Sequence, residues 1–520
     1  MKTTIKYIPA FVISLLLLTG CNDFLTEKPQ SKLTQDGFYS TQTRINEGVI
    51  GCYASLANAS QKDWFFTELR SDNAWQSDMG TSNIDRTDQT DISVFRAYAT
   101  LPEIQTYWAG VFQTISNING VLPSVVDNKY VEYEPLRAQY EGELRFLRAY
   151  NYYNLVCLFG DMFKVTTVLS PAEAKTLERR PVDEIYDDLI IPDLKYAADN
   201  LPAQYAATDV GRATKWAAMG LLAKVYMMRG GSANIALAKP LLEQVMATPL
   251  LGLLTGTNAY ATIFSTTNEM NKEIIFAIRY KGGSSGLGST FWPSFAPSGS
   301  ANLFLKIGSP LGYNSPTNEL MSLFNAQPQD KRASACFAVW TGKTPNIPYV
   351  CKYVDANMTQ ANQAENDWIV LRYADIELLY AEALAQDGNF ATANKYVNDI
   401  RSRAGVATLP AFTSATEALD AVYAERRLEL AFENQRWFDL LRMAKSYNDP
   451  NKPVEVLKKH VFETDWAFIP PGGTSVNAGY GMYTVIPVAD PSYFIKERLL
   501  LPIPQYEINI NPNIKQNYPY

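Results

Sequence analysis

The residues of this chain that could perform catalysis form only fragments of known catalytic arrangements. Gly282-Gly283-Ser284-Ser285-Gly286 matches G-x-S-x-G, the pattern that presents a nucleophilic serine in many hydrolases. That serine needs a strand before it, a helix after it and a histidine as its base. His460 is the only histidine, and the motif is rich in glycine at both ends. The segment therefore predicts a flexible loop, and a hydrolase is kept only as a remote alternative.

Acidic side chains recur with helical spacing late in the chain. Glu425, Glu429 and Glu433 lie four residues apart. Basic and acidic residues are interleaved with them: Arg426, Arg427, Arg436, Asp439 and Arg442. On a helix this spacing predicts ion pairs, and partly buried pairs fix how helices dock. A glycosidase would instead need two carboxylates that flank a cleft. We therefore expect no catalytic residue.

Metal and cofactor chemistry is weakly represented. Asp85, Asp88 and Asp91 could contribute to a structural calcium site, but their spacing is not that of an EF-hand loop. We expect no cofactor and no other metal. Among the cysteines after residue 21, no CxxC pair occurs, Cys157 reads as a buried thiol, and Cys336 could pair with Cys351.

Ligand binding is better supported than catalysis, because tryptophans lie in polar sequence without helical periodicity. Trp75 lies in TELRSDNAWQSD beside Asp72 and Asn73, Trp292 follows the Gly/Ser loop, and Trp340 lies further along the same irregular stretch. The C–H face of a sugar packs on such rings, while planar polar side chains bind its hydroxyl groups. These five residues form the predicted ligand site. The alternative for each tryptophan is core or interface packing.

The N-terminus predicts export and a lipid anchor. Lys2 and Lys6 precede an apolar run over residues 8–18 that is too short to span a bilayer. Leu18-Thr19-Gly20-Cys21 then places small residues before a cysteine, which is the bacterial lipoprotein pattern. Residues 1–20 are the predicted signal peptide, Cys21 is the predicted lipidated residue, and residues 21–40 form a tether. The alternative is an ordinary signal peptide with an incidental cysteine.

Charge and composition limit the class of protein. A net charge of −7 and a pI near 5.2 exclude a basic nucleic-acid-binding surface. Hydrophobic residues make up 47% of the chain and charged residues 19%, which is typical of a large globular protein. No later apolar segment approaches the length of a transmembrane helix, so the lipid alone would hold the protein to a membrane.

Helical periodicity dominates the rest of the chain. Helices are predicted over residues 41–58, 101–126, 134–159, 183–200, 213–229, 233–248, 371–385, 390–404 and 418–444. The helices at 371–385 and 390–404 face each other through small residues across a tight turn, as in a tetratricopeptide repeat. We therefore expect a mostly α fold: an array of tetratricopeptide-like helix pairs over 41–249 and 368–447. Residues 250–367 are predicted to form a loop-rich ligand-binding lobe, and 448–520 an irregular segment packed on the scaffold.

Several motifs, in order along the chain, resemble the SusD/RagB family. They are Cys21-Asn22-Asp23-Phe24-Leu25, the helix around Glu143-Leu144-Arg145, LVCLFGD at 155–161, Gly211-Arg212-Ala213-Thr214, Leu371-Arg372-Tyr373-Ala374-Asp375, the run around Glu425-Arg426-Arg427, Arg436-Trp437-Phe438-Asp439, and Leu501-Pro502-Ile503-Pro504.

The resemblance implies a surface-exposed outer-membrane lipoprotein. Such a protein captures oligosaccharides, or peptides in the RagB branch, and delivers them to a TonB-dependent transporter of the SusC type. The family fold implied is an array of tetratricopeptide-like helix pairs with a loop-rich ligand lobe. Arg372 lies in a family motif, which leaves a scaffold role and a ligand role equally open for it. Glycan and peptide ligands both stay open.

Overall fold

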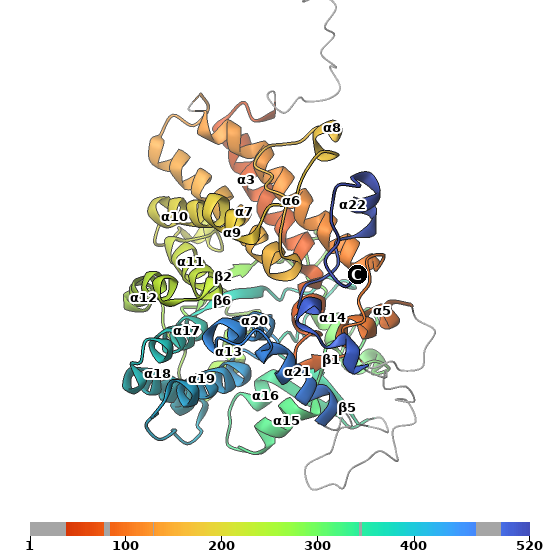
Figure 1. Ribbon diagram of the computed structural model, residues 1–520, viewed down its shortest axis with the longest axis vertical. Coiled ribbons are helices and arrows are strands. Elements are labelled where there is room, and N and C mark those ends of the chain that lie inside the picture. Colours follow the sequence, from red (N-terminus) through yellow and green to blue (C-terminus); the bar gives the residue numbers. More distant parts are fainter. Residues whose placement is uncertain (1–37, 77–83, 128, 343–345, 464–489) are drawn as a thin grey trace, which may run out of the picture.

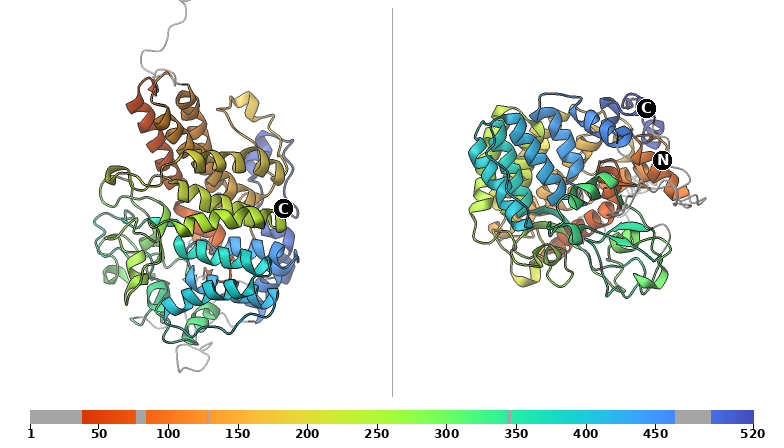
Figure 2. Two further views of the ribbon diagram at one scale, coloured as in Figure 1. Left: turned by 90° about the vertical axis from the view of Figure 1, so that its left-hand side faces the viewer. Right: turned by 90° about the horizontal axis from the view of Figure 1, so that it is seen from below.

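The computed structural model describes residues 38–76, 84–127, 129–342, 346–463 and 490–520 (Figure 1). The predicted signal peptide, Cys21 and most of the predicted tether lie outside the described residues. Within the described part, long helices stack from one end of the molecule to the other, and short strands and loops lie beside them (Figure 2). The prediction of a mostly α, tetratricopeptide-like fold is confirmed.

The scaffold consists of helices that pack pairwise. Its main members are α3 (Gln42–Ala59), α6 (Pro102–Val126), α7 (Glu134–Phe159), α10 (Ile191–Asn200), α11 (Lys215–Arg229), α12 (Ser232–Ala247), α17 (Tyr373–Gln386), α18 (Phe390–Ala404), α19 (Ala415–Glu429) and α20 (Arg436–Ser446). α3 packs on α6, α7 on α10, α11 on α12, and α17 on α18, while α12 also contacts α17 and so joins the two parts of the array.

Local sequence explains where these helices begin and end. Pro135 lies in the first turn of α7, where a missing N–H is tolerated, and Gly160 follows its last residue with φ +75°. The predicted apolar face of α7, formed by Phe146, Tyr150, Tyr153 and Cys157, is buried. Most other residues of α7 after Tyr140 are buried as well, and the helix packs on both α6 and α10.

Two predicted helices are interrupted in the structure. The predicted segment at 418–444 is two helices, α19 and α20, because Phe432 and Asn434 adopt left-handed φ values of +64° and +59° between them. The predicted helix at 183–200 contains a π-helical turn over Tyr186–Ile190, between α9 (Val182–Ile185) and α10. Residues 448–520 are also less irregular than predicted, because they contain α21 (Lys452–Glu463) and α22 (Gln505–Ile510).

Short elements make up the segment between α12 and α17. Its strands are β2 (Ile274–Ile278), β3 (Ser315–Pro316), β4 (Phe337–Trp340), β5 (Ile347–Val350) and β6 (Trp368–Arg372), and its helices are α13 (Ala259–Ile263), α14 (Phe291–Phe295), α15 (Asn318–Asn325) and α16 (Ala333–Cys336). The remaining short elements of the chain are α4 (Asp63–Thr67), β1 (Ala74–Trp75), α5 (Ile84–Ser93) and α8 (Pro171–Ala174). We refer to residues 250–367 as the lobe.

Antiparallel strand pairs connect the lobe to the rest of the protein. β2 pairs with β6, so the entry to the lobe lies beside its exit into α17. β4 pairs with β5 as a small two-stranded sheet within the lobe, and β1, from the N-terminal part, pairs with β3. The lobe also has an apolar cluster of its own around Trp292, separate from the main core. It is thus attached to the scaffold but packed internally as well.

Candidate functional site

Three half-buried aromatic rings meet on the lobe. The ring centroid of Phe304 lies 6.1 Å from that of Trp340 and 5.2 Å from that of Tyr349, with edge-on geometry in both cases. All three side chains are partly exposed. We call Phe304, Trp340 and Tyr349 the aromatic platform.

The small sheet of β4 and β5 positions two of these rings. Trp340 pairs with Ile347, and Ala338 pairs with Tyr349. Residues two apart on one strand share a face of the sheet, and directly paired residues share it too, so Trp340 and Tyr349 lie diagonally on the same face. The indole of Trp340 also lies over Gly342, since a Cβ built there would come within 2.4 Å of Trp340 Nε1. The indole can occupy this position because residue 342 has no side chain.

Trp292 supports the platform from beneath. Its ring centroid lies 6.3 Å from Phe304 and 6.3 Å from Tyr349, and its side chain is only 1% exposed. Leu305 and Met358 complete the apolar cluster around it. The structure therefore brings together two predicted site residues, Trp340 and Trp292, but only Trp340 presents surface. Direct ligand contact by Trp292 stays a prediction, one that its burial disfavours.

Trp75 lies on a different strand. It is half-buried on β1, where it pairs with Ser315 of β3, and β3 in turn contacts β5. Trp75 is thus linked to the platform through one intervening strand. Its predicted contact with ligand stays a prediction.

Asp72 and Asn73, which precede Trp75 in the chain, bind buried arginine side chains. Both are fully buried, with Asp72 Oδ1 2.6 Å from Arg436 Nε and Asn73 Oδ1 3.1 Å from Arg427 Nε. Burial opposes ionisation of Asp72, but Arg427 and Arg436 outweigh it and hold its pKa below the usual range. Because these groups already bind buried arginines, a ligand could reach them only by breaking ion pairs. Their predicted ligand role is disfavoured on this ground.

Arg372 lies inside a buried ionic cluster rather than at a surface. Its guanidinium is 2.6 Å from Glu433, 2.7 Å from Glu429 and 2.9 Å from Glu273, and the side chain is 1% exposed. The whole cluster balances five basic side chains against five acidic ones: Arg332, Lys352, Arg372, Arg401 and Arg403 with Glu273, Asp330, Glu425, Glu429 and Glu433.

This cluster connects the lobe to the scaffold. Three of its members, Glu273, Arg332 and Lys352, belong to the lobe. On the scaffold side, Arg372 ends β6 and Glu429 ends α19. A buried pair is strongly destabilised when one partner is removed, because the other charge is left uncompensated. The cluster thus gives Arg372 a structural position, which fixes the orientation of the lobe that carries the aromatic platform.

The fragments of catalytic sequence lie in other settings. Ser284 is exposed in a loop closed by the bridge between Lys281 and Leu287, and α14 begins only at Phe291, so the strand–serine–helix arrangement of a hydrolase is not formed there. His460 Nδ1 is 2.7 Å from Glu319 Oε2, which joins α21 to α15.

The predicted calcium and disulfide sites have no support in the described residues. Asp91 pairs with Arg96 and Asp88 accepts a bond from Tyr98, whereas Asp85 lies outside the residues whose side chains are described. In the described part of the chain no three acidic, histidine or cysteine side chains form a metal-binding group. Cys336 and Cys351 are free thiols, although the N–H of Cys351 donates to the carbonyl of Cys336 at 3.0 Å. Cys157 is buried, as predicted.

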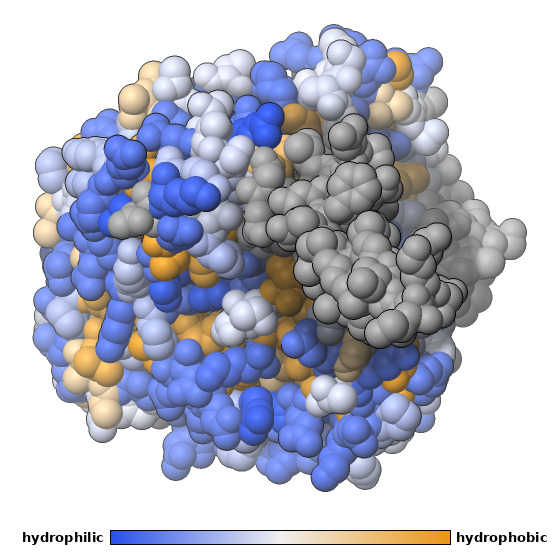
Figure 3. Space-filling model, turned by 90° about the horizontal axis from the view of Figure 1, so that it is seen from above, coloured by the Kyte–Doolittle hydropathy of each residue, from blue (hydrophilic) through white to orange (hydrophobic). Residues whose placement is uncertain are grey.

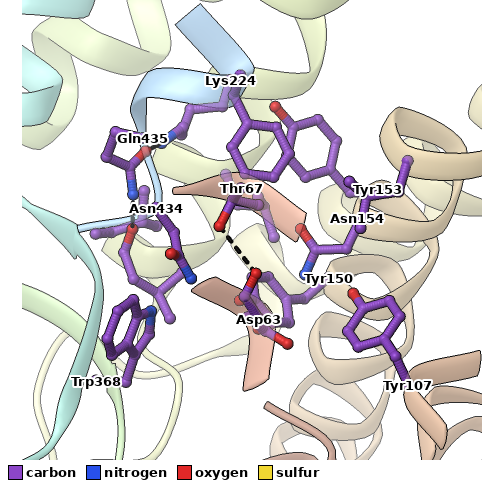
Figure 4. A pocket seen from close by; sticks show the side chains of 15 residues that line it. Asp63, Thr67, Tyr107, Tyr150, Tyr153, Asn154, Lys224, Trp368, Asn434 and Gln435 are labelled. Carbon is purple, nitrogen blue, oxygen red and sulfur yellow. Dashed lines mark hydrogen bonds between the residues drawn. The ribbon is translucent and has the colours of Figure 1, made fainter. Parts of the chain in front are cut away.

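The centre of the molecule contains a small cavity between α4, α7, α11 and β6 (Figure 4). Its volume is about 30 Å³, and Asp63, Tyr107, Tyr150 and Lys224 are among its lining residues. Such a volume holds about two water molecules, far less than a sugar. It is a small internal cavity of the scaffold, lined by both polar and apolar side chains, rather than a ligand site.

Sequence reasoning missed Phe304 and Tyr349. Both are single aromatic residues in irregular sequence, and nothing local distinguishes them from core residues. The available signal was their position in the same 250–367 stretch as Trp292 and Trp340, together with polar neighbours such as Asn302 and Lys306.

Comparison with known protein families gives two matches. A family model described as the SusD family matches residues 332–520, and one described as "Starch-binding associating with outer membrane" matches residues 23–227. Together they cover most of both parts of the helical scaffold, although α12 lies between the two matched ranges.

Individual proteins agree with these models. A SusD-like protein P25 of Formosa agariphila is 28% identical, with 84% of this chain and 90% of that protein covered. A SusD-like protein of Bacteroides ovatus is 24% identical over 96% of this chain and 95% of its own.

Solved structures share the fold. A laminarin-binding SusD-like protein superposes with a TM-score of 0.72 at 23% identity, covering 93% of this chain and 100% of its own. A SusD homolog from Bacteroides thetaiotaomicron has a TM-score of 0.76 at 21% identity, covering 94% and 98%.

Proposed function

Because this chain belongs to the SusD/RagB family, we propose that it binds an oligosaccharide or polysaccharide at the cell surface and delivers it to a TonB-dependent outer-membrane transporter of the SusC type. The protein would act as a binding subunit without catalysis of its own. The transporter and the glycan would be its two partners.

The aromatic platform is the observation that carries the proposed ligand. Partly exposed Phe304, Trp340 and Tyr349 offer ring faces and edges on one side of the lobe. Flat rings of this kind pack against the C–H faces of pyranose sugars and bury weakly polar surface. The buried ionic cluster holds the lobe in place, so the rings would be largely pre-organised for a ligand, which lowers the entropic cost of binding.

The outer membrane is the proposed location, with Cys21 as the lipid anchor. One matching family model is described as associating with the outer membrane. Among the described helices, none is both long enough and apolar enough to cross a bilayer. From above, hydrophilic residues cover most of the described surface, with smaller apolar patches between them (Figure 3).

Peptide binding is the alternative on the same architecture, and one experiment separates the two. The purified mature chain is titrated by calorimetry against a panel of soluble polysaccharides, laminarin included, and against a panel of mixed peptides. We expect saturable binding to at least one glycan and none to the peptides. Binding confined to peptides would refute the glycan assignment.

The same samples test the expected lack of catalysis. After prolonged incubation, the best-bound glycan should show no shorter products on chromatography. Product release that persists through further purification and is lost in Ser284→Ala would instead support the hydrolase alternative.

A further inference from the structure

A second cavity, distinct from the aromatic platform, lies between α3, the turn at 207–212 and strand β2. Its volume is about 400 Å³, within the range of small-molecule sites. None of the platform residues lines it. Its walls include Ile50, Ala54 and Ala57 of α3, Val210 of the turn, and Ile278 and Leu287 of the lobe. We call it the α3 groove.

Exposed aliphatic side chains converge on this groove. Ile50 is 49% exposed, Val210 48% and Leu287 53%, although they come from three separate segments. The small side chains of Ala54 and Ala57 leave space for a ligand along α3. Scattered exposed apolar residues need no explanation, but apolar residues gathered around a concave site indicate a binding surface.

Positive charge gathers on the lobe side of the groove. Arg279 and Lys281 line it on that side. Arg212, on the turn at 207–212, is already paired with Glu143 at 3.1 Å and with Asp209, the one carboxylate among the lining residues, at 2.9 Å. The turn at 207–212 lies against the stem of Arg279, because a Cβ at Gly211 would come within 2.9 Å of Arg279 Cγ. Gly211 has φ +107°, a conformation that glycine adopts without strain.

At least one of these cations is available to a ligand. Lys281 Nζ lies 2.7 Å from Glu365, but the Lys281 side chain is 69% exposed. An exposed ion pair of this kind is weak, so Lys281 can exchange Glu365 for another anion at little cost. Arg279 is more firmly held, by Glu269 at 2.6 Å and Asp367 at 3.0 Å, which already balance its charge, so Lys281 is the cation that a ligand would engage.

The groove offers little to a sugar. The hydroxyl of Tyr53 donates to Glu143 at 2.8 Å, and that of Tyr280 donates to the carbonyl of Ala57 at 2.8 Å. Of the other fourteen side chains that line it, seven are aliphatic and one is aromatic, and four of the six polar ones are already in ion pairs. The lining matches a molecule with an apolar body and one acidic end.

We propose that the α3 groove is a second ligand site, which takes a small amphiphilic anion with its aliphatic or aryl body between α3 and β2 and its acidic group at Lys281. This site goes beyond the proposed glycan-binding function and does not depend on it.

The test uses the mature chain with two probes, anilinonaphthalene sulfonate followed by fluorescence and dodecanoate as a competitor. We expect saturable binding of one sulfonate per chain and its displacement by dodecanoate. Ala54→Trp, which fills the groove, should weaken binding about tenfold or more. Leu287→Glu, at an exposed position, should do the same by repulsion. Lys281→Gln should weaken binding less and reduce its dependence on salt.

Matched controls keep the outcome clear. Glu47→Trp places the same ring on the exposed face of α3 and should leave probe binding unchanged, as should Trp340→Ala in the platform. If Ala54→Trp does not fold, Leu287→Glu decides alone. No saturable binding up to about 1 mM, or binding unaffected by folded Leu287→Glu, would overturn the proposal. Binding of a uronic acid disaccharide in place of both probes would overturn the ligand class.

Discussion

The indole of Trp340 lies edge-on against the phenyl ring of Phe304, with 6.1 Å between ring centroids and 84° between ring planes. This contact leaves part of the indole exposed beside Tyr349. Trp340→Ala should therefore weaken glycan binding about tenfold or more, because it removes both buried area and an aromatic contact of about 0.5–1.5 kcal/mol. Calorimetric titration with the best-bound glycan measures the effect.

The control for this change is another half-buried tryptophan. Trp216, on α11, should be replaceable by alanine without loss of glycan affinity. Trp292→Ala should differ from both Trp340→Ala and Trp216→Ala. Because Trp292 is only 1% exposed, its truncation should lower the free energy of unfolding by about 3–5 kcal/mol. Equal affinity of wild type and Trp340→Ala would remove the platform from the ligand site.

Gly342→Ala should displace the indole of Trp340 while leaving the tryptophan itself in the sequence. The added methyl group would come within 2.4 Å of Trp340 Nε1, so the indole must turn away. We expect glycan affinity to fall nearly as far as in Trp340→Ala, with little change in melting temperature. Gly252→Ala is the matched control, because a Cβ there meets nothing within 4 Å. Full affinity in Gly342→Ala would show that the indole position is not critical.

Much of the scaffold could be predicted from sequence, because its helices are long, amphipathic and ended by recognisable residues. Gly160 and Gly405 both adopt positive φ directly after a predicted helix. The interruption at Phe432 and Asn434 could not be predicted, because phenylalanine gives no signal for a left-handed φ and a single asparagine favours one only weakly.

The candidate site was harder to predict because its parts are distant in sequence. Trp292 and Trp340 were both predicted from their position in the irregular stretch, but Trp292 is buried by a cluster of the lobe's own residues. Asp72 resembles a ligand-binding residue until Arg436, 364 positions later, is seen to bind it. Periodicity and local composition contain no information about such partners.

Arg372→Met should lower stability strongly. The change leaves Glu273, Glu429 and Glu433 buried with less compensating charge, which costs about 3–5 kcal/mol in comparable buried pairs. Chemical denaturation followed by circular dichroism measures the loss. Lys395→Met, which breaks an exposed pair with Asp399, should change stability by about 0.5 kcal/mol or less. Unchanged stability with lost glycan binding would instead assign Arg372 to the ligand.

Cys21→Ala should release the protein from the membrane fraction. The prediction depends on the Leu18-Thr19-Gly20-Cys21 sequence, since the lipid is attached to the thiol. Fractionation of cells that express wild type and variant compares the two. Intact-mass measurement of the wild type should show an acylated chain that begins at Cys21. A wild-type mass without any acyl increment would refute the anchor.

Asp63→Asn should make the protein less sensitive to pH. Asp63 is buried at the central cavity, its Oδ1 has no hydrogen-bond partner among the described residues, and burial raises its pKa to about 8 (Figure 4). The folded state therefore holds a proton that the unfolded chain releases near pH 4, so the contribution of Asp63 to stability is full below pH 4 and is lost as the pH rises toward 8.

An asparagine at position 63 has no such proton to lose. The free energy of unfolding of Asp63→Asn, minus that of wild type, should rise by up to about 1.4 kcal/mol per pH unit between these limits and then level off. Urea denaturation at a series of pH values measures this difference, and the same change at exposed Asp199 controls for the amide itself. A difference that stays constant from pH 4 to pH 8 would show that Asp63 is not protonated in the folded protein.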